Sequence, residues 1–206
     1  KMYEKLDFYP TYYANLDDVV IISHKKNLQK LLNEKKINKY FYLKWCPWIK
    51  YSKESYNFIE NEKYYGVTKV GLNKLSKSCD KFHSWGNTGS DCVQLAIMLG
   101  YSEIYIIGID GYVEKIKEAK ELTVNRRKTL VMDETPKDNP NYWFASYQEK
   151  GEEFNFPNEK TAHVPGWIYS KKVCDKLNIK YYNLSNPNYI KCISHIEYPN
   201  FVNKIN

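Results

Sequence analysis

The sequence contains almost no arginine, although it is strongly basic. Arg126 and Arg127 are the only arginines, and lysine supplies nearly all of the positive charge behind the formal net charge of +7. Proteins that read nucleic acids rely on arginine for bidentate contacts with bases and phosphates. A lysine-rich surface attracts anions only in a general way. We therefore expect no nucleic-acid partner.

The short motifs of the common nucleotide, hydrolase and metal sites are also missing. The sequence has no Walker A motif, no GxGxxG and no GxSxG elbow. Its four histidines show no HxH or HExxH spacing, and Asp17-Asp18 does not stand where a metal-binding DxD motif would. We expect no metal site and no serine-hydrolase triad.

Cysteines are few, and long apolar runs are absent. The five cysteines are scattered and form no CxxC pair, which is typical of reduced, buried thiols in a cytosolic protein. No apolar run reaches the roughly 18 residues of a membrane span, and we expect no signal peptide. The chain begins with Lys1 rather than Met, which suggests a fragment without its natural N-terminus.

Strand-like and helix-like stretches alternate along the chain. Hydrophobic content of 43% over 206 residues predicts one globular domain, residues 1–206. The pattern predicts an α/β fold of the Rossmann-like, GT-A-variant type, with a mostly parallel sheet, helices on both faces and a helical or irregular lid. Its predicted strands are residues 19–22, 39–44, 104–109 and 179–184. One predicted helix begins at Ser23, and two others cover residues 90–100 and 166–177.

Two stretches break this alternation. The weak periodicity of residues 52–82 predicts helix or irregular structure there. Residues 113–160 predict a helix followed by a long aromatic loop, either a lid-like insertion or a solvated surface excursion. The 20 tyrosines indicate half-buried strand faces or a cleft that stacks sugars or bases.

Residues 87–112 form the central unit of the sequence. A small polar turn (Asn87, Thr88, Gly89 and Ser90) opens an apolar helix, with Thr88 or Ser90 as its expected N-cap. A buried strand then ends at Asp110. Backbone N–H groups and the helix dipole favour a phosphate or carboxylate at such a turn, although Asp91 already places one negative charge there.

His163 stands just before the third predicted helix, where a histidine can act as a general base or play a structural role. His24 also stands near a helix start, and we expect it to be exposed rather than functional.

Residues 86–112 and 158–192 resemble the bacterial lipooligosaccharide sialyltransferases that use CMP-sialic acid. They also resemble a wider group of glycosyltransferase-like and hydroxymethylpterin diphosphokinase-like proteins. The shared pattern is a small turn with glycine, a helix ending in LGY, EIYxxGID followed by a tyrosine, a histidine before a helix, and a KYYNLS-type strand. These motifs cover about a third of the chain in matching order.

The resemblance implies a role for each matching residue. Thr88 and Gly89 contact the nucleotide, and Asp110 lies at the strand end. The Tyr112 hydroxyl binds the leaving phosphate in place of a metal ion, and His163 deprotonates the acceptor hydroxyl. A metal-independent reaction without a cofactor is implied, with the nucleotide sugar as substrate.

The chain departs from the family pattern at several positions. Trp85 occupies the position where the family has an arginine, and Glu118 occupies the position of its second phosphate-binding tyrosine. Lys160 replaces a further tyrosine of the family. The N-terminal Gly-rich loop that binds the nucleotide in the family is not visible in this sequence. We expect Tyr142 or Tyr147 to replace the second tyrosine. Added positive charge is expected from Lys117, Lys160 or the Arg126-Arg127 pair.

The resulting hypothesis is a metal-independent, sialyltransferase-like glycosyltransferase that moves a sugar, preferably CMP-linked, to a glycan or lipooligosaccharide acceptor. One alternative is a Mg²⁺-dependent pterin diphosphokinase-like enzyme, with Asp110 and Asp17-Asp18 as candidate ligands. The other is a non-catalytic carbohydrate- or nucleotide-binding module. We expect a cytoplasmic protein with at most peripheral association with the inner face of the membrane. The sequence is compatible with a homo-oligomer.

Overall fold

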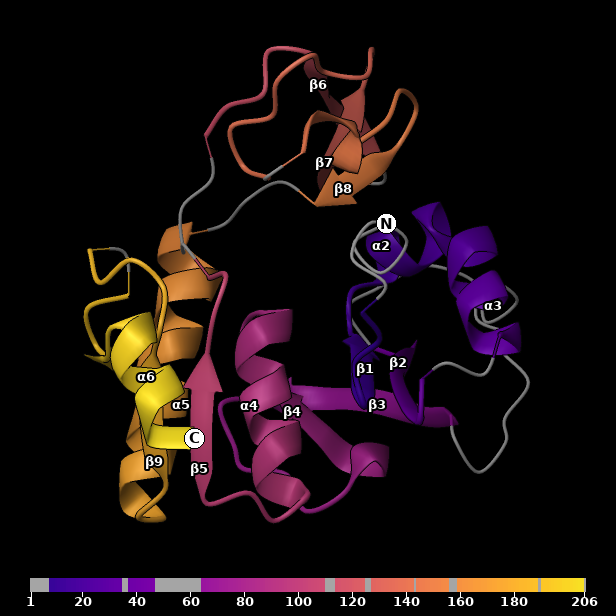
Figure 1. The fold of residues 1–206 in the computed structure, drawn as a ribbon. Helices are drawn as coiled ribbons and strands as arrows, with labels where there is room; N and C mark the ends of the chain where they lie inside the picture. The colour runs from indigo at the N-terminus through magenta and orange to yellow at the C-terminus, as the bar shows by residue number, and fades with distance from the viewer. Residues whose placement is uncertain are drawn as a thin grey trace. The chain divides into compact units, whose positions relative to one another are not determined.

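The computed structural model shows a mixed α/β protein (Figure 1). It describes residues 8–34, 37–46, 64–109, 114–124, 127–142, 144–155, 159–188 and 190–205. The chain divides into two compact units. Unit 1 consists of residues 1–68 and 114–157, and unit 2 of residues 69–113 and 158–206. No helix in the described ranges is long and apolar enough to cross a membrane.

Four parallel strands form the largest sheet, in the order β1-β2-β3-β4. They are β1 (Tyr12–Asn15), β2 (Lys39–Trp45), β3 (Tyr64–Leu72) and β4 (Phe82–Ser84). The strand predicted at residues 39–44 is confirmed as β2. It is buried on both faces, with Tyr40 and Tyr42 on one and Phe41 and Leu43 on the other, as an inner parallel strand should be.

Residues 64–72 are a strand, which corrects the prediction of helix or irregular structure there. The β-branched residues Val67, Thr68 and Val70 favour this conformation, and Val67 is fully buried. Residues 47–63 lie outside the described ranges. A short 3-10 helix, η2 (Cys79–Lys81), leads into β4.

The apolar run at residues 19–22 was predicted as a strand, and this prediction is wrong. It lies in helix α2 (Asp18–Ser23), which is followed by α3 (Lys25–Asn33). Asp17 starts the turn: its Oδ1 accepts from the Val20 amide at 3.2 Å, and its carbonyl accepts from the Ile21 amide at 3.1 Å. An aspartate in this position favours a helix start, and a four-residue apolar run cannot distinguish helix from strand.

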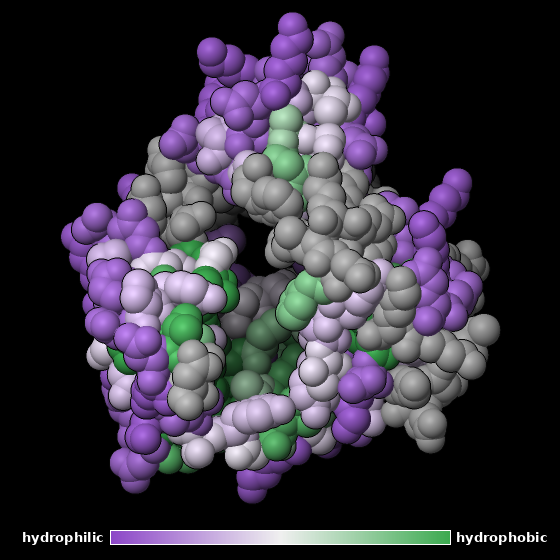
Figure 2. Space-filling view, in the orientation of Figure 1, coloured by the Kyte–Doolittle hydropathy of each residue, from purple (hydrophilic) through white to green (hydrophobic). Residues whose placement is uncertain are grey.

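The prediction of a helix after residue 113 is also wrong, because this stretch forms a β-hairpin. Strands β6 (Ala119–Val124) and β7 (Arg127–Met132) pair antiparallel, and β8 (Glu153–Asn155) joins β7. Lys128 pairs with Glu121 across the hairpin at 2.6 Å, and the surface over this segment is mostly hydrophilic (Figure 2). The lysines and glutamates suggested a helix, but cross-strand pairing, which local propensity does not encode, decides the structure.

Unit 2 contains a three-stranded parallel sheet in the order β10-β9-β5, with helices packed against it. The predictions for residues 90–100, 166–177 and 179–184 are confirmed, whereas the strand predicted at 104–109 is confirmed only to Ile106, and Ile107 is exposed. They correspond to α4 (Thr88–Met98), β5 (Glu103–Ile106), α5 (Val164–Lys176) and β9 (Lys180–Asn183). β10 (Ser194–His195) and α6 (Tyr198–Ile205) complete the unit. Among the described strands β5 is an outer strand of this sheet, not the central strand that its sequence suggested.

The two faces of this sheet carry different layers. Ile104, Ile106 and Tyr181 face a core that includes Val93 of α4 and Trp167 of α5. On the other face the Tyr105 ring stacks on Tyr182 and contacts Phe201 of α6, with centroids 5.4 Å and 4.6 Å apart. Alternation along the strands thus places helices on both faces within unit 2.

All five cysteines are free thiols, as predicted, and Cys46 and Cys174 are buried. Burial, followed by the nearby Asp91 carboxylate, raises the pKa of the Cys92 thiol on α4 to about 12. Burial likewise raises the pKa of Cys174 on α5 to about 11. Both thiols therefore keep their protons in the fold at pH values where the unfolded chain loses them.

This difference predicts that stability falls as pH rises above 9. Between pH 9 and 11 the unfolded chain releases the Cys92 proton while the folded chain retains it, so the free energy of unfolding decreases by up to about 1.4 kcal/mol per pH unit for this thiol. Urea unfolding at pH 8, 9 and 10 measures the slope. Cys92→Ala should flatten it, and an unchanged slope would show that Cys92 does not contribute.

Candidate functional site

The polar turn before α4 is closed by its own side chains. Asn87, rather than Thr88 or Ser90, is the N-cap, and its Oδ1 accepts from the Ser90 amide at 2.9 Å. Ser90 is fully buried, and its hydroxyl donates to the Asn87 carbonyl at 3.0 Å. Asn87, Thr88 and Gly89 remain partly exposed. Asparagine is as good an N-cap as serine, which explains the shift of the cap by one residue.

Gly89 has a packing role in this turn. A Cβ on Gly89 would lie 2.6 Å from the Trp167 indole of α5. The absence of a side chain thus lets the indole lie against the first turn of α4. The contact with a nucleotide that the family resemblance implies for Thr88 and Gly89 stays a prediction.

The start of α5 meets the start of α4. A π-helical turn, η4 (Glu159–His163), leads into α5, and the Asn87 Nδ2 donates to the His163 carbonyl at 3.2 Å. The backbone approach is close here: a Cβ on Gly166 would lie 2.3 Å from the Trp85 carbonyl oxygen, and one on Gly86 would lie 2.5 Å from that of Ala162. The predicted base and the predicted nucleotide turn are therefore neighbours.

Gly166 gives a direct test of this close approach. Alanine normally stabilises a helix interior relative to glycine by about 0.5–1 kcal/mol. Here we expect Gly166→Ala to lower the free energy of unfolding by about 1–3 kcal/mol, because the methyl group overlaps a backbone carbonyl that cannot rotate away. Urea unfolding measures the change.

Lys172→Ala is the matched control, since Lys172 is an exposed residue of the same helix. This control should change stability by at most about 0.5 kcal/mol. A Gly166→Ala protein that is more stable than the wild type would contradict the close contact.

The carboxyl ends of β5 and β9 are tied together beside these helix starts. The Leu184 amide donates to the Ile106 carbonyl at 2.8 Å, and the Ile109 amide donates to the Ser185 hydroxyl at 3.0 Å. Helices that connect parallel strands begin at this edge, where α/β proteins usually bind ligands. Asp110 and Tyr112, predicted at the same edge, lie outside the described residues.

Behind the turn, α4 is anchored by buried polar side chains. The Asp91 carboxylate accepts from the Trp85 amide at 2.6 Å and pairs with the Lys69 ammonium at 2.9 Å. One turn later, Gln94 accepts from the Ser76 amide at 2.6 Å and donates to the His83 carbonyl at 2.9 Å. The charge of Asp91 is therefore matched by a lysine and turned away from solvent, so it weighs less against an anion at the helix start than the sequence suggested.

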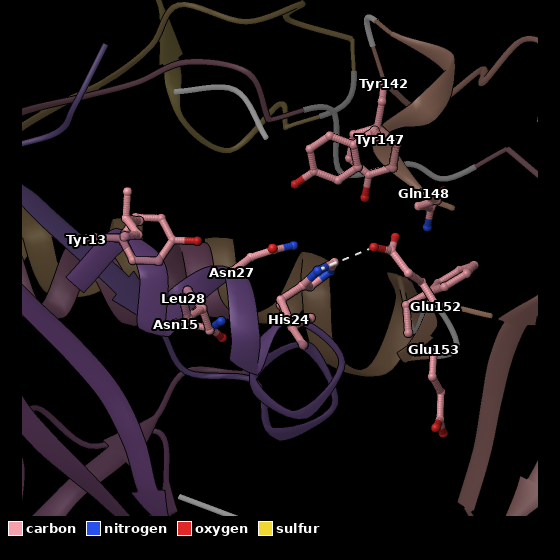
Figure 3. A pocket seen from close by; sticks show the side chains of 13 residues that line it. Tyr13, Asn15, His24, Asn27, Leu28, Tyr142, Tyr147, Gln148, Glu152 and Glu153 are labelled. Atoms are coloured by element: carbon pink, nitrogen blue, oxygen red, sulfur yellow. Dashed lines mark ion pairs between the residues drawn. The ribbon is translucent and has the colours of Figure 1, made fainter. Parts of the chain in front are cut away.

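Three other predicted site residues belong to unit 1. Lys117 is exposed, whereas Tyr142 and Tyr147 line a cavity of about 160 Å³ (Figure 3). Their rings stack with centroids 3.8 Å apart, and burial, followed by the neighbouring Tyr147, raises the pKa of Tyr142 to about 12. Lys160 belongs to unit 2, where it is exposed on η4.

The cavity contains two residues that the sequence interpretation did not select. His24 Nδ1 lies 3.5 Å from Glu152 Oε1, and the pair lies beneath the two tyrosines in Figure 3. His24 was expected to be exposed, but it is half-buried. Its partner is far away along the chain, so no local spacing could have identified the pair.

No group of three or more histidine, cysteine, aspartate or glutamate side chains in the described ranges is arranged to hold a metal ion. Comparison with protein-family models, with curated proteins and with solved structures found no match.

Proposed function

We propose that this chain is a metal-independent, sialyltransferase-like glycosyltransferase that moves a sugar from a nucleotide-activated donor, preferably CMP-linked, to a glycan or lipooligosaccharide acceptor. The observation that carries the proposal is the 3.2 Å bond from the Asn87 amide to the His163 carbonyl. It brings the residue implied as the base beside the turn implied to hold the nucleotide.

The electrostatics of this junction favour a phosphate. Helix α4 begins at this junction, and the N–H groups of its first turn carry partial positive charge. Lys160 on η4 adds a full positive charge within unit 2. We propose that this region stabilises the negative charge that develops on the departing nucleotide phosphate, together with the Tyr112 hydroxyl.

The proposed reaction is a single displacement. His163 accepts the proton of the acceptor hydroxyl, and the acceptor oxygen then forms a bond to the anomeric carbon of the donor sugar. The bond from that carbon to the phosphate oxygen breaks, and the nucleotide leaves with the electron pair.

We propose a Rossmann-like, GT-A-variant arrangement as the corresponding fold. Its support is the parallel strands β5 and β9, the helix α5 that leads into β9, and the helix layers on both faces of their sheet. Ligand binding outside the carboxyl ends of parallel strands is the general rule for such sheets.

Release of nucleotide from CMP-sialic acid and from other sugar nucleotides, with and without a glycan acceptor, tests the proposal. We expect acceptor-dependent release of CMP that a metal chelator does not reduce. Turnover of ATP with a pterin that requires Mg²⁺ would instead indicate the diphosphokinase-like alternative. Sugar or nucleotide binding without turnover of any donor would indicate a non-catalytic module.

A further inference from the structure

The cavity of unit 1 has a lining of unusual charge for such a basic chain. Among the described residues that line it, the charged or titratable side chains other than tyrosine are two carboxylates and one histidine, with no lysine or arginine. The lining residues come from β1, α2, α3, the turn between these helices and residues 142–154: Tyr13, Asn15, Val20, His24, Asn27, Leu28, Leu31, Tyr142, Tyr147, Gln148, Glu152, Glu153 and Phe154. A carboxylate that lines a cavity repels a phosphate bound in the same cavity, so the lining favours a neutral or cationic ligand.

The orientation of the side chains favours a neutral ligand. In Figure 3 the hydroxyls of Tyr142 and Tyr147 point into the space above His24, while their rings stack on each other. A cation would need an open aromatic face, whereas hydroxyl groups that point into a cavity favour hydrogen bonding. The amide of Gln148 and the ring of His24 border the same space.

These polar groups are held in position by the surrounding protein. Glu152 Oε2 accepts from the Glu149 amide at 2.9 Å, which leaves Oε1 directed at His24. Gln148 is buried, and its Oε1 accepts from the buried Asn139 amide at 3.0 Å, so its NH₂ group is the end that faces the cavity. A pre-positioned set of donors and acceptors costs little ordering entropy when a ligand binds.

The size of the cavity limits the ligand to one ring. A volume of about 160 Å³ is below the about 300–1,000 Å³ that is usual for pockets of drug-sized ligands. Val20, Leu28, Leu31 and Phe154 add an apolar wall to the polar lining. A ring with hydroxyls on its rim and C–H groups on its faces fits both kinds of surface.

We propose that this cavity binds one neutral, polyhydroxylated ring of monosaccharide size. His24, Gln148 and the hydroxyls of Tyr142 and Tyr147 supply the hydrogen bonds, and Glu152 orients His24. This proposal goes beyond the transfer reaction proposed for the start of α4, because binding here is independent of a nucleotide and of turnover.

Ligand-observed NMR and calorimetry with neutral monosaccharides test the proposal. The panel should contain glucose, galactose and N-acetylglucosamine, with glucose 6-phosphate and choline as the anionic and cationic probes. We expect at least one neutral sugar to bind, and both charged probes to bind more weakly. Because loss of a hydrogen-bond partner inside a cavity costs about 1–3 kcal/mol, His24→Ala and, through the orientation of His24, Glu152→Gln should weaken binding about fivefold to a hundredfold.

The chain offers a matched control pair. His195 and Glu197 also form a histidine–glutamate contact, at 3.0 Å, but they do not line the cavity. His195→Ala and Glu197→Gln should leave sugar binding unchanged. Tyr147→Phe removes one hydroxyl while retaining the stacked ring, so it tests the cavity even if the His24 variant fails to fold, and it should weaken binding about threefold to tenfold.

Three results would overturn the proposal. They are no binding of any neutral sugar at millimolar concentration, tighter binding of glucose 6-phosphate or choline than of the sugars, and equal loss of binding in the control variants. None of these results depends on CMP release, so failure of this site and failure of the transferase proposal can be distinguished.

Discussion

Replacing Asp91 by alanine should lower the free energy of unfolding by about 3–5 kcal/mol, because it removes the buried carboxylate that pairs with the Lys69 ammonium group. The Asp91 side chain is fully inaccessible, and that of Lys69 is 10% exposed. The carboxylate also accepts hydrogen bonds from the Ser84 hydroxyl at 3.1 Å and the Trp85 amide at 2.6 Å. All three donors lose this acceptor at once. Urea unfolding followed by circular dichroism measures the change.

A surface ion pair provides the control for Asp91. Asp175 contacts Lys171 one helical turn away on α5 at 2.5 Å, and 59% of its side chain is exposed. Asp175→Ala should cost less than about 1 kcal/mol, since water screens such pairs. If Asp91→Ala cost no more than Asp175→Ala, the account of α4 as anchored through a buried carboxylate would be wrong.

Replacing His163 by alanine should reduce sugar transfer about a hundredfold to ten-thousandfold, the usual contribution of a positioned general base. The Asn87 side chain bonds the backbone carbonyl of His163, so the substitution keeps that contact. We therefore expect kcat to fall while the affinity for the nucleotide changes little. Steady-state kinetics with the preferred donor and acceptor give both parameters.

The pH dependence separates a base from a structural histidine. If His163 removes the acceptor proton, its protonation at low pH abolishes activity, and the acid limb of the kcat profile should disappear in His163→Ala. His195→Ala, in the same unit, should retain both the rate and the acid limb. A His163→Ala enzyme with full transfer activity would remove this residue from the proposed mechanism.

Long periodic segments were predictable from the sequence. The apolar spacing in residues 90–100 identified α4, and the alternation in residues 39–44 identified β2. Both signals are local, since the buried face of a helix or strand is recorded in consecutive residues. The short run at residues 19–22 was misread, because it fits two structures equally well and the capping interaction of Asp17 decides between them.

Long-range pairing accounts for the other errors. Nothing local in residues 119–132 shows that they pair as β6 and β7, or that β7 then pairs with β8. The same limit applies to the candidate sites. The neighbourhood of Asn87 and His163 was expected only through family resemblance, whereas the contact of His24 with Glu152 was missed. In each case two segments distant in sequence had to be brought together.

The most direct test of the central claim is a crystal structure of the protein with CMP bound. The claim is that the junction of α4 and α5 is the nucleotide site. It predicts the phosphate at the Thr88 and Gly89 amides, on the His163 side of the α4 turn, with the cavity of unit 1 empty of nucleotide. Specific binding of CMP in the unit 1 cavity, or no binding at the α4 turn at saturating CMP, would contradict it.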